Sequence, residues 1–178
     1  NLRIGGHDHL GESFRDFQIQ IKSLKNQGII LAIVSKNDEA IAIEAINSHP
    51  EMILSMKDFV TYRINWEDKA KNIVDIVDEL NLGLQSVVFL DDSPFERARV
   101  QEALPEVLVP ELPKDPTDYN TFLSKLRCFD TTNITEEDKI RVNLYKSESK
   151  RTKLKQQLKS VSDWIKTLNL TIVIENIK

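Results

Sequence analysis

A strand-like apolar segment, a polar turn and a helix follow one another three times within the first 104 residues of this chain. The strand and helix of each unit are expected at 29–34 and 39–48, at 59–64 and 67–80, and at 86–90 and 95–104. The run at 29–34 is continuously apolar and rich in β-branched residues, which is typical of a strand covered on both faces in a parallel sheet. Repeated strand–turn–helix units imply right-handed βαβ crossovers. The sequence therefore predicts an α/β fold with a mostly parallel sheet flanked by helices.

The segments around these units complete the predicted organisation. Apolar residues three or four positions apart predict an amphipathic helix at 12–25. After Pro110 come a proline-punctuated link and then the other expected elements, which are helices near 119–126, 135–158 and 161–168 and a terminal strand. We therefore expect a core domain at 1–113 and a helical extension at 114–178 whose last strand starts a further domain. The first residue is not Met and the last strand has no evident partner, so we expect both ends to be cuts in a larger polypeptide.

Composition limits the classes of function. A chain of 178 residues with 40% hydrophobic content can form one well-packed core. Its net charge of -4 gives no broad basic surface, so a nucleic-acid partner is not expected. There is no apolar run of the ~20 residues that a membrane-spanning helix requires, and no membrane partner is expected. Cys128 is the only cysteine, which fits a reducing compartment, and we expect a cytoplasmic protein.

Polar residues follow the expected strands, at the sheet edge where ligands of open parallel sheets bind. Ser35 and Asn37 follow the first strand and can donate hydrogen bonds to phosphate oxygens, helped by backbone N–H groups of the next helix. We also assign substrate binding to Lys36 in the same turn. Lys69, at the entry to the helix 67–80, can reach the same edge. The alternatives are that Ser35 is a helix N-cap and that Lys69 is a surface lysine.

An acidic pair follows the third expected strand. Asp91 and Asp92 are hard oxygen ligands of the kind that Mg²⁺ prefers, usually with waters and a substrate phosphate completing its octahedron. An adjacent Asp pair is more often a loop or helix-cap feature, but its position directly after a buried strand favours a metal site. A hydroxyl, a lysine and two carboxylates in this order predict a phosphate site with Mg²⁺.

The same segments resemble a known superfamily. The second, third and fourth motifs of the haloacid dehalogenase (HAD) superfamily are similar to VSKND, INWEDKAKN and VVFLDDSPFE. Nearly the entire chain resembles the FkbH-like branch of that superfamily. The similar segments include GHDHLGESFRDFQ, LAIVSKNDEAIAIEAI, ALPEVLVPELP and CFDTT. The resemblance implies a Rossmann-like HAD core with a parallel sheet flanked by helices, followed by a helical C-terminal extension.

The resemblance also implies an activity. Members of this branch take a glyceryl unit from 1,3-bisphosphoglycerate, remove phosphate, and load the acyl group onto the phosphopantetheine arm of an acyl carrier protein in polyketide biosynthesis. Carried over to this chain, Ser35 would bind the transferring phosphoryl group and Lys69 would neutralise its charge. Asp91 and Asp92 would coordinate Mg²⁺. A generic Mg²⁺-dependent HAD phosphatase and a non-catalytic HAD-like interaction module are the alternatives.

One part of the HAD machinery has no counterpart in the sequence. The superfamily's Asp nucleophile lies on a strand that the family places upstream of the equivalent of Asn1. Asp8 has no apolar strand before it and is read as loop, and the string at 7–9 as a metal site is less well supported because two imidazoles need a third ligand. Acyl delivery could use a thiol, so Cys128 is a candidate acyl carrier, although a buried, inert cysteine is the favoured interpretation.

Overall fold

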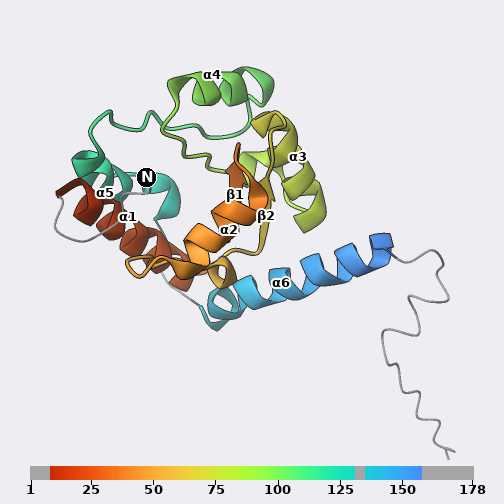
Figure 1. The fold of residues 1–178 in the computed structure, drawn as a ribbon. Helices are drawn as coiled ribbons and strands as arrows, with labels where there is room; N and C mark the ends of the chain where they lie inside the picture. The colour runs from red at the N-terminus through yellow and green to blue at the C-terminus, as the bar shows by residue number, and fades with distance from the viewer. Residues whose placement is uncertain (1–8, 131–134, 158–178) are drawn as a thin grey trace, which may run out of the picture.

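The structure is a computed structural model that describes residues 9–130 and 135–157 (Figure 1). Two strands lie within this part of the chain, β1 (Ala32–Ser35) and β2 (Thr61–Ile64). The α-helices are α1 (His9–Asn26), α2 (Glu39–Ser48), α3 (Lys69–Leu80), α4 (Pro94–Ala103), α5 (Tyr119–Ser124) and α6 (Glu136–Gln157). Single turns of 3₁₀ helix occur at Met56–Asp58, Leu84–Ser86, Pro116–Asp118 and Arg127–Phe129. The predicted α/β class is confirmed. The predicted helix at 161–168 and the terminal strand lie outside the described residues.

The two strands form a parallel sheet. Ala32 pairs with Thr61 and Ser35 pairs with Ile64, so both strands end at the same edge. The backbone N–H of Asn65 donates to the carbonyl of Ser35 and extends the pairing one residue further. The helices α2 and α3 begin shortly after the ends of β1 and β2. Their first turns and the preceding loops therefore lie at the carboxyl edge of the sheet, where the sequence predicts the site.

The first predicted strand is shorter than expected. It begins at Ala32 and not at Ile29, because the backbone N–H of Ile29 donates to the carbonyl of Leu24 and closes the end of α1. Gly28 has a φ of 94°, a left-handed conformation that a glycine adopts without a steric cost. Coverage on both faces is also not observed, since Ala32 is exposed and the rest of β1 is only half-buried. Within the described residues β1 pairs with β2 alone.

The third predicted strand is not formed as a strand. Leu84–Ser86 is a turn of 3₁₀ helix, and the 86–90 segment has one isolated parallel bridge, between Val88 and Leu108. Its ladder consists of two backbone hydrogen bonds, from Phe89 to Leu108 and from Leu108 to Val87. The segment 107–109 takes part in the same bridge through Leu108. An extended segment that pairs over so short a stretch has too few ladder hydrogen bonds to count as a strand.

The core lies between α3, α4 and the bridged segments. Its buried members are Ala70, Ile73, Val77, Phe89, Val100, Leu104 and Val107. Val100 of α4 is fully buried, and Val34 of β1 packs against this cluster. The loop that carries Asp91 and Asp92 therefore runs directly out of the core, between the bridged segment and α4.

Two further packings complete the described fold. The helix α5 lies against α1, where Tyr119 packs its ring against Phe14 and Phe17 (Figure 1). The helix α6 starts immediately after Thr135 and packs against α3. The boundary expected at 113/114 stays a prediction. None of the helices in the described part of the chain combines the length and the apolar character needed to cross a bilayer.

Candidate functional site

The turn after β1 carries three of the predicted site residues. Ser35 is the last residue of the strand and is half-buried. Asp38, and not Ser35, is the N-cap of α2, because the Asp38 carboxylate accepts a hydrogen bond from the backbone N–H of Ile41 at 3.1 Å. The N-cap alternative for Ser35 is therefore wrong. The Asn37 side chain is exposed, and its Oδ1 accepts from the Asp38 backbone N–H at 2.8 Å, a local turn contact.

Lys69 reaches the acidic pair. It is the first residue of α3, whose N-cap is Asp68, and its Nζ lies 2.5 Å from Oδ2 of Asp91. Both side chains are well shielded, with 12% of Lys69 and 6% of Asp91 exposed. The interpretation of Lys69 as an ordinary surface lysine is wrong. Residues 22 positions apart thus meet at the carboxyl edge, as the sequence predicts.

The loop that carries the two aspartates is held by its own neighbours. Oδ1 of Asp91 accepts from the backbone N–H of Ser93 at 2.9 Å, while the Asp92 side chain is exposed. Nη1 of Arg97 donates to the backbone carbonyls of Asp91 at 2.8 Å and of Asp92 at 3.1 Å. Both carbonyls are therefore fixed by a cation from the first two turns of α4. The loop presents one buried and one exposed carboxylate.

A second ion pair crosses the same edge. Nζ of Lys36 lies 2.7 Å from Oε1 of Glu96, a residue in the first turn of α4. Lysines from the turn after β1 and from the start of α3 thus both contact acids that follow the bridged segment. Of the predicted residues, Lys36, Lys69 and Asp91 take part in these two pairs, and Ser35 and Asp92 are their chain neighbours.

Two residues of the site were missed by the sequence interpretation, Glu96 and Arg97. Glu96 stands three residues after Ser93, which is the spacing of a helix capping box. Because capping already explains a glutamate at this position, the sequence does not indicate a further role. The hydrogen bonds that Arg97 makes to Asp91 and Asp92 go to backbone carbonyls, and such contacts leave no pattern in a sequence. The charged residues just after an acidic loop are the one signal that could have drawn attention to them.

The other candidates lie elsewhere. Cys128 is exposed in the 3₁₀ turn Arg127–Phe129, so the interpretation as a buried small hydrophobe is wrong. Local burial and the nearby Asp130 charge raise the pKa of the Cys128 thiol, against a smaller backbone hydrogen-bond effect, which disfavours the nucleophilic thiolate. His9 is the first residue of α1, while His7 and Asp8 are outside the described residues.

The site offers Mg²⁺ two carboxylate ligands. Within 9–130 and 135–157 there is no group of three or more His, Cys, Asp or Glu side chains arranged to hold a metal ion. Mg²⁺ does not need such a group, because it is commonly bound through one or two carboxylates, with waters and substrate phosphate supplying the other ligands. Asp91 and Asp92 can provide those carboxylates. Asp91 would have to exchange Lys69 for the metal to do so.

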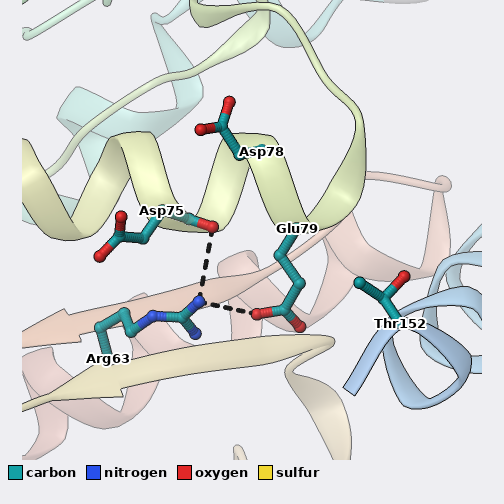
Figure 2. A pocket seen from close by; sticks show the side chains of 5 residues that line it. All are labelled: Arg63, Asp75, Asp78, Glu79 and Thr152. Carbon is teal, nitrogen blue, oxygen red and sulfur yellow. Dashed lines mark hydrogen bonds and ion pairs between the residues drawn. The ribbon is translucent and has the colours of Figure 1, made fainter. Parts of the chain in front are cut away.

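A cavity of about 320 Å³ lies away from this edge, between β2, α3 and α6 (Figure 2). Its lining is Arg63, Asp75, Asp78, Glu79 and Thr152. The Arg63 guanidinium is held by the Glu79 carboxylate at 2.8 Å and by the Asp75 carbonyl at 3.4 Å, as Figure 2 shows. The arginine is therefore engaged in an internal ion pair and does not offer a phosphate-binding group.

Comparison with known proteins gives one strong likeness. No protein-family model and no curated protein matches the chain. A solved structure does match, with 47% identity and a TM-score of 0.72: the N-terminal part of the protein BF1531 from Bacteroides fragilis, which contains a phosphatase domain and is complexed with Mg. The match covers 75% of this chain and 35% of that one. The two chains share a fold. The present chain spans about a third of the length of its neighbour.

Proposed function

We propose that the carboxyl edge of the β1–β2 sheet is the metal- and phosphate-holding part of a Mg²⁺-dependent phosphatase domain of the HAD type. The observation that carries this proposal is the contact between Lys69 and Asp91, which joins a cation and a metal-type carboxylate at the edge where parallel sheets bind ligands. The likeness to a solved structure that contains a phosphatase domain and Mg supports it.

The proposed roles follow from the positions of the side chains. The Ser35 hydroxyl at the end of β1 donates a hydrogen bond to a phosphoryl oxygen. The ammonium groups of Lys36 and Lys69 offset the negative charge of the phosphoryl group. Asp91 and Asp92 hold Mg²⁺, which when bound supplies further positive charge to the phosphoryl oxygens.

The attacking carboxylate is not among these residues. The HAD resemblance implies that it comes from a strand ahead of Asn1, and hydrolysis is accordingly proposed for the protein at its full natural length. The 178 residues contain the groups that bind and neutralise phosphate.

The finer proposal concerns the substrate. The FkbH-like resemblance favours 1,3-bisphosphoglycerate as the phosphorylated three-carbon substrate and an acyl carrier protein as the acceptor of the glyceryl unit, in polyketide biosynthesis. Phosphate removal and glyceryl transfer would then be two parts of one reaction sequence. Cys128 as an intermediate acyl carrier is the weakest part of this proposal, since the raised pKa of its thiol disfavours the nucleophilic thiolate.

Intact-mass measurement of the carrier protein tests the substrate proposal. The full-length protein is incubated with Mg²⁺, 1,3-bisphosphoglycerate and carrier protein. Glyceryl mass on the phosphopantetheine arm supports glyceryl transfer, and release of free phosphate without that mass indicates a phosphatase of small phosphometabolites. If neither product forms and the protein binds no phosphate, the chain is a non-catalytic interaction module. Full loading by Cys128→Ser would exclude the thiol.

A further inference from the structure

Glu96 occupies a helix-capping position without making the expected cap contact. Ser93 is the N-cap of α4, and its hydroxyl accepts from the backbone N–H of Glu96 at 3.4 Å. In a capping box, the glutamate at this position would in turn accept from the backbone N–H of the N-cap residue. That N–H donates to Oδ1 of Asp91 instead. The Glu96 carboxylate is therefore released from the local helix and reaches Lys36.

The burial of Glu96 is unusual for a charged residue in the first turn of a helix. Its side chain is only 12% exposed, and a buried carboxylate is costly unless it is paired. One oxygen, Oε1, is paired with Lys36 at 2.7 Å. The other, Oε2, is buried and has no hydrogen-bond partner among the described residues. A favourable interaction with the helix dipole does not require burial, so the local role of Glu96 does not account for its position.

The partner of Glu96 is a flexible cation beside the proposed phosphate site. Lys36 directly follows Ser35, and its side chain is 32% exposed. A free lysine side chain loses rotamer entropy when a ligand fixes it. Holding the ammonium group in place before substrate arrives removes part of that cost from binding.

We propose that Glu96 is a positioning residue, which fixes the Lys36 ammonium group at the carboxyl edge of β1 for binding of the substrate phosphate. The inference rests on the proposed phosphatase function and adds a residue to it. The unpartnered Oε2 leaves Glu96 able to accept one more hydrogen bond from bound water or ligand without releasing Lys36.

Steady-state kinetics of the full-length protein with p-nitrophenyl phosphate tests the proposal. Glu96→Ala is expected to raise KM about tenfold while kcat changes less than about threefold, because Lys36 acts in binding. Lys36→Ala is expected to raise KM by a similar factor. The KM of the double variant is expected to be no higher than that of Lys36→Ala alone, since each single change already breaks the Lys36–Glu96 pair. Glu96→Gln keeps an oxygen acceptor for Lys36, so its KM should lie close to that of the wild-type protein.

Glu102→Ala is the matched control, because Glu102 is an exposed glutamate on the same helix. Additive effects of Glu96→Ala and Lys36→Ala would overturn the proposal, as would an unchanged KM. A loss of kcat that Glu96→Gln shares would also overturn it. Thermal unfolding of each variant identifies one that does not fold, in which case Glu96→Gln and Lys36→Ala still decide between the outcomes.

Titration with inorganic phosphate in the presence of Mg²⁺ separates this proposal from the phosphatase proposal. If the wild-type protein binds phosphate but hydrolyses no ester, the phosphatase proposal fails and the role of Glu96 is read from binding alone. Glu96→Ala is then expected to weaken phosphate binding about tenfold. Tighter phosphate binding would overturn the inference, because it would mean that Glu96 competes with phosphate for Lys36.

Discussion

Nζ of Lys69 lies 2.5 Å from Oδ2 of Asp91, and both side chains are almost completely shielded from solvent. The other oxygen of Asp91 accepts from the backbone of Ser93. The Asp91 carboxylate, which we propose as a Mg²⁺ ligand, is thus already satisfied by a lysine and an amide. A metal ion that binds Asp91 directly has to displace the ammonium group, so metal and lysine compete for one oxygen.

Replacement of Asp91 by asparagine tests which aspartate holds the metal. Asp91→Asn removes the charge while it preserves shape, and we expect the affinity for Mg²⁺ to fall at least about tenfold, or ~1.4 kcal/mol. Isothermal titration of the protein with Mg²⁺ measures this loss. Asp92→Asn is the comparison, and a smaller loss is expected because the Asp92 side chain is exposed and lies one position further along the loop. The reverse order would assign the direct contact to Asp92.

Removal of the competing lysine should have opposite effects on the two ligands. Lys69→Ala is expected to tighten Mg²⁺ binding several-fold in the absence of phosphate, since Asp91 then carries an unpaired charge. The same variant should weaken phosphate binding at least about tenfold, because a cation of the anion site is lost. Titrations with each ligand measure both changes.

Lys71→Ala is the matched control for that experiment. Lys71 lies on the same helix, has a side chain that is 60% exposed, and pairs with Glu67 at the surface. Exposed pairs of this kind contribute little, so neither affinity should change. If Lys69→Ala left Mg²⁺ binding unchanged or weaker, the competition between lysine and metal would be disproved.

The sequence predicts the meeting of Lys69 and Asp91 because that meeting depends only on topology. The carboxyl ends of neighbouring parallel segments lie at the same edge of the sheet. The order of strands, turns and helices can be predicted from apolar runs and turn residues. Helix α2 is predicted at its observed bounds because local signals mark its two ends, Asp38 at the start and Pro50 after the last turn. The Mg²⁺ assignment follows from the acidic pair after the third expected strand, whereas the phosphatase assignment requires the resemblance to a superfamily.

Other features depend on hydrogen bonds and ion pairs that apolar patterns and turn residues do not show. Ile29 is apolar and β-branched, yet its N–H closes α1, so the strand starts three residues later. The 86–90 segment has the composition of a strand, but its ladder is limited to a short stretch with Leu108. Glu96 has the spacing of a cap, but its carboxylate contacts a lysine 60 residues away. The Ile29 contact is a local helix-end hydrogen bond, whereas in Glu96 a tertiary contact overrides the local preference.

The stability of the chain should depend on pH through Asp58. Burial alone would raise the pKa of this carboxyl, but hydrogen bonds from Lys25 and the Ser55 backbone, with the charges of Lys25 and Lys22, hold the pKa below its usual value of 3.8. A depressed pKa means that the unfolded state binds the proton more readily. The contribution of the Asp58 carboxylate to the free energy of unfolding is therefore present at neutral pH and is lost as the pH falls below about 3.8.

Urea unfolding of Asp58→Asn checks this expectation. Hydrogen bonds to charged groups contribute ~1.5–3 kcal/mol, so the variant should lose about 2 kcal/mol in the free energy of unfolding at pH 7. The difference from wild type should be smaller at pH 3 than at pH 7, because below about 3.8 the unfolded state takes up a proton that the folded carboxylate binds less readily. Asp16→Asn, on the exposed side of α1, should change the free energy of unfolding by less than ~0.5 kcal/mol at either pH. A difference that stayed constant with pH would disprove the role of the Asp58 charge.

Ser149 should anchor α6 to the rest of the fold. It is 2% exposed, and its hydroxyl donates to Oε1 of Glu79, whose other oxygen holds the Arg63 guanidinium seen in Figure 2. Ser149→Ala leaves a buried carboxylate oxygen with one donor fewer, so we expect a loss of ~1–2 kcal/mol in the free energy of unfolding and faster amide exchange in α6 and α3. Ser147→Ala is the matched control, because the Ser147 hydroxyl is exposed and donates only to the Asn143 carbonyl within α6. Equal exchange rates in the two variants would show that α6 is held by its apolar contacts, such as buried Val142, and not by the hydrogen bond to Glu79.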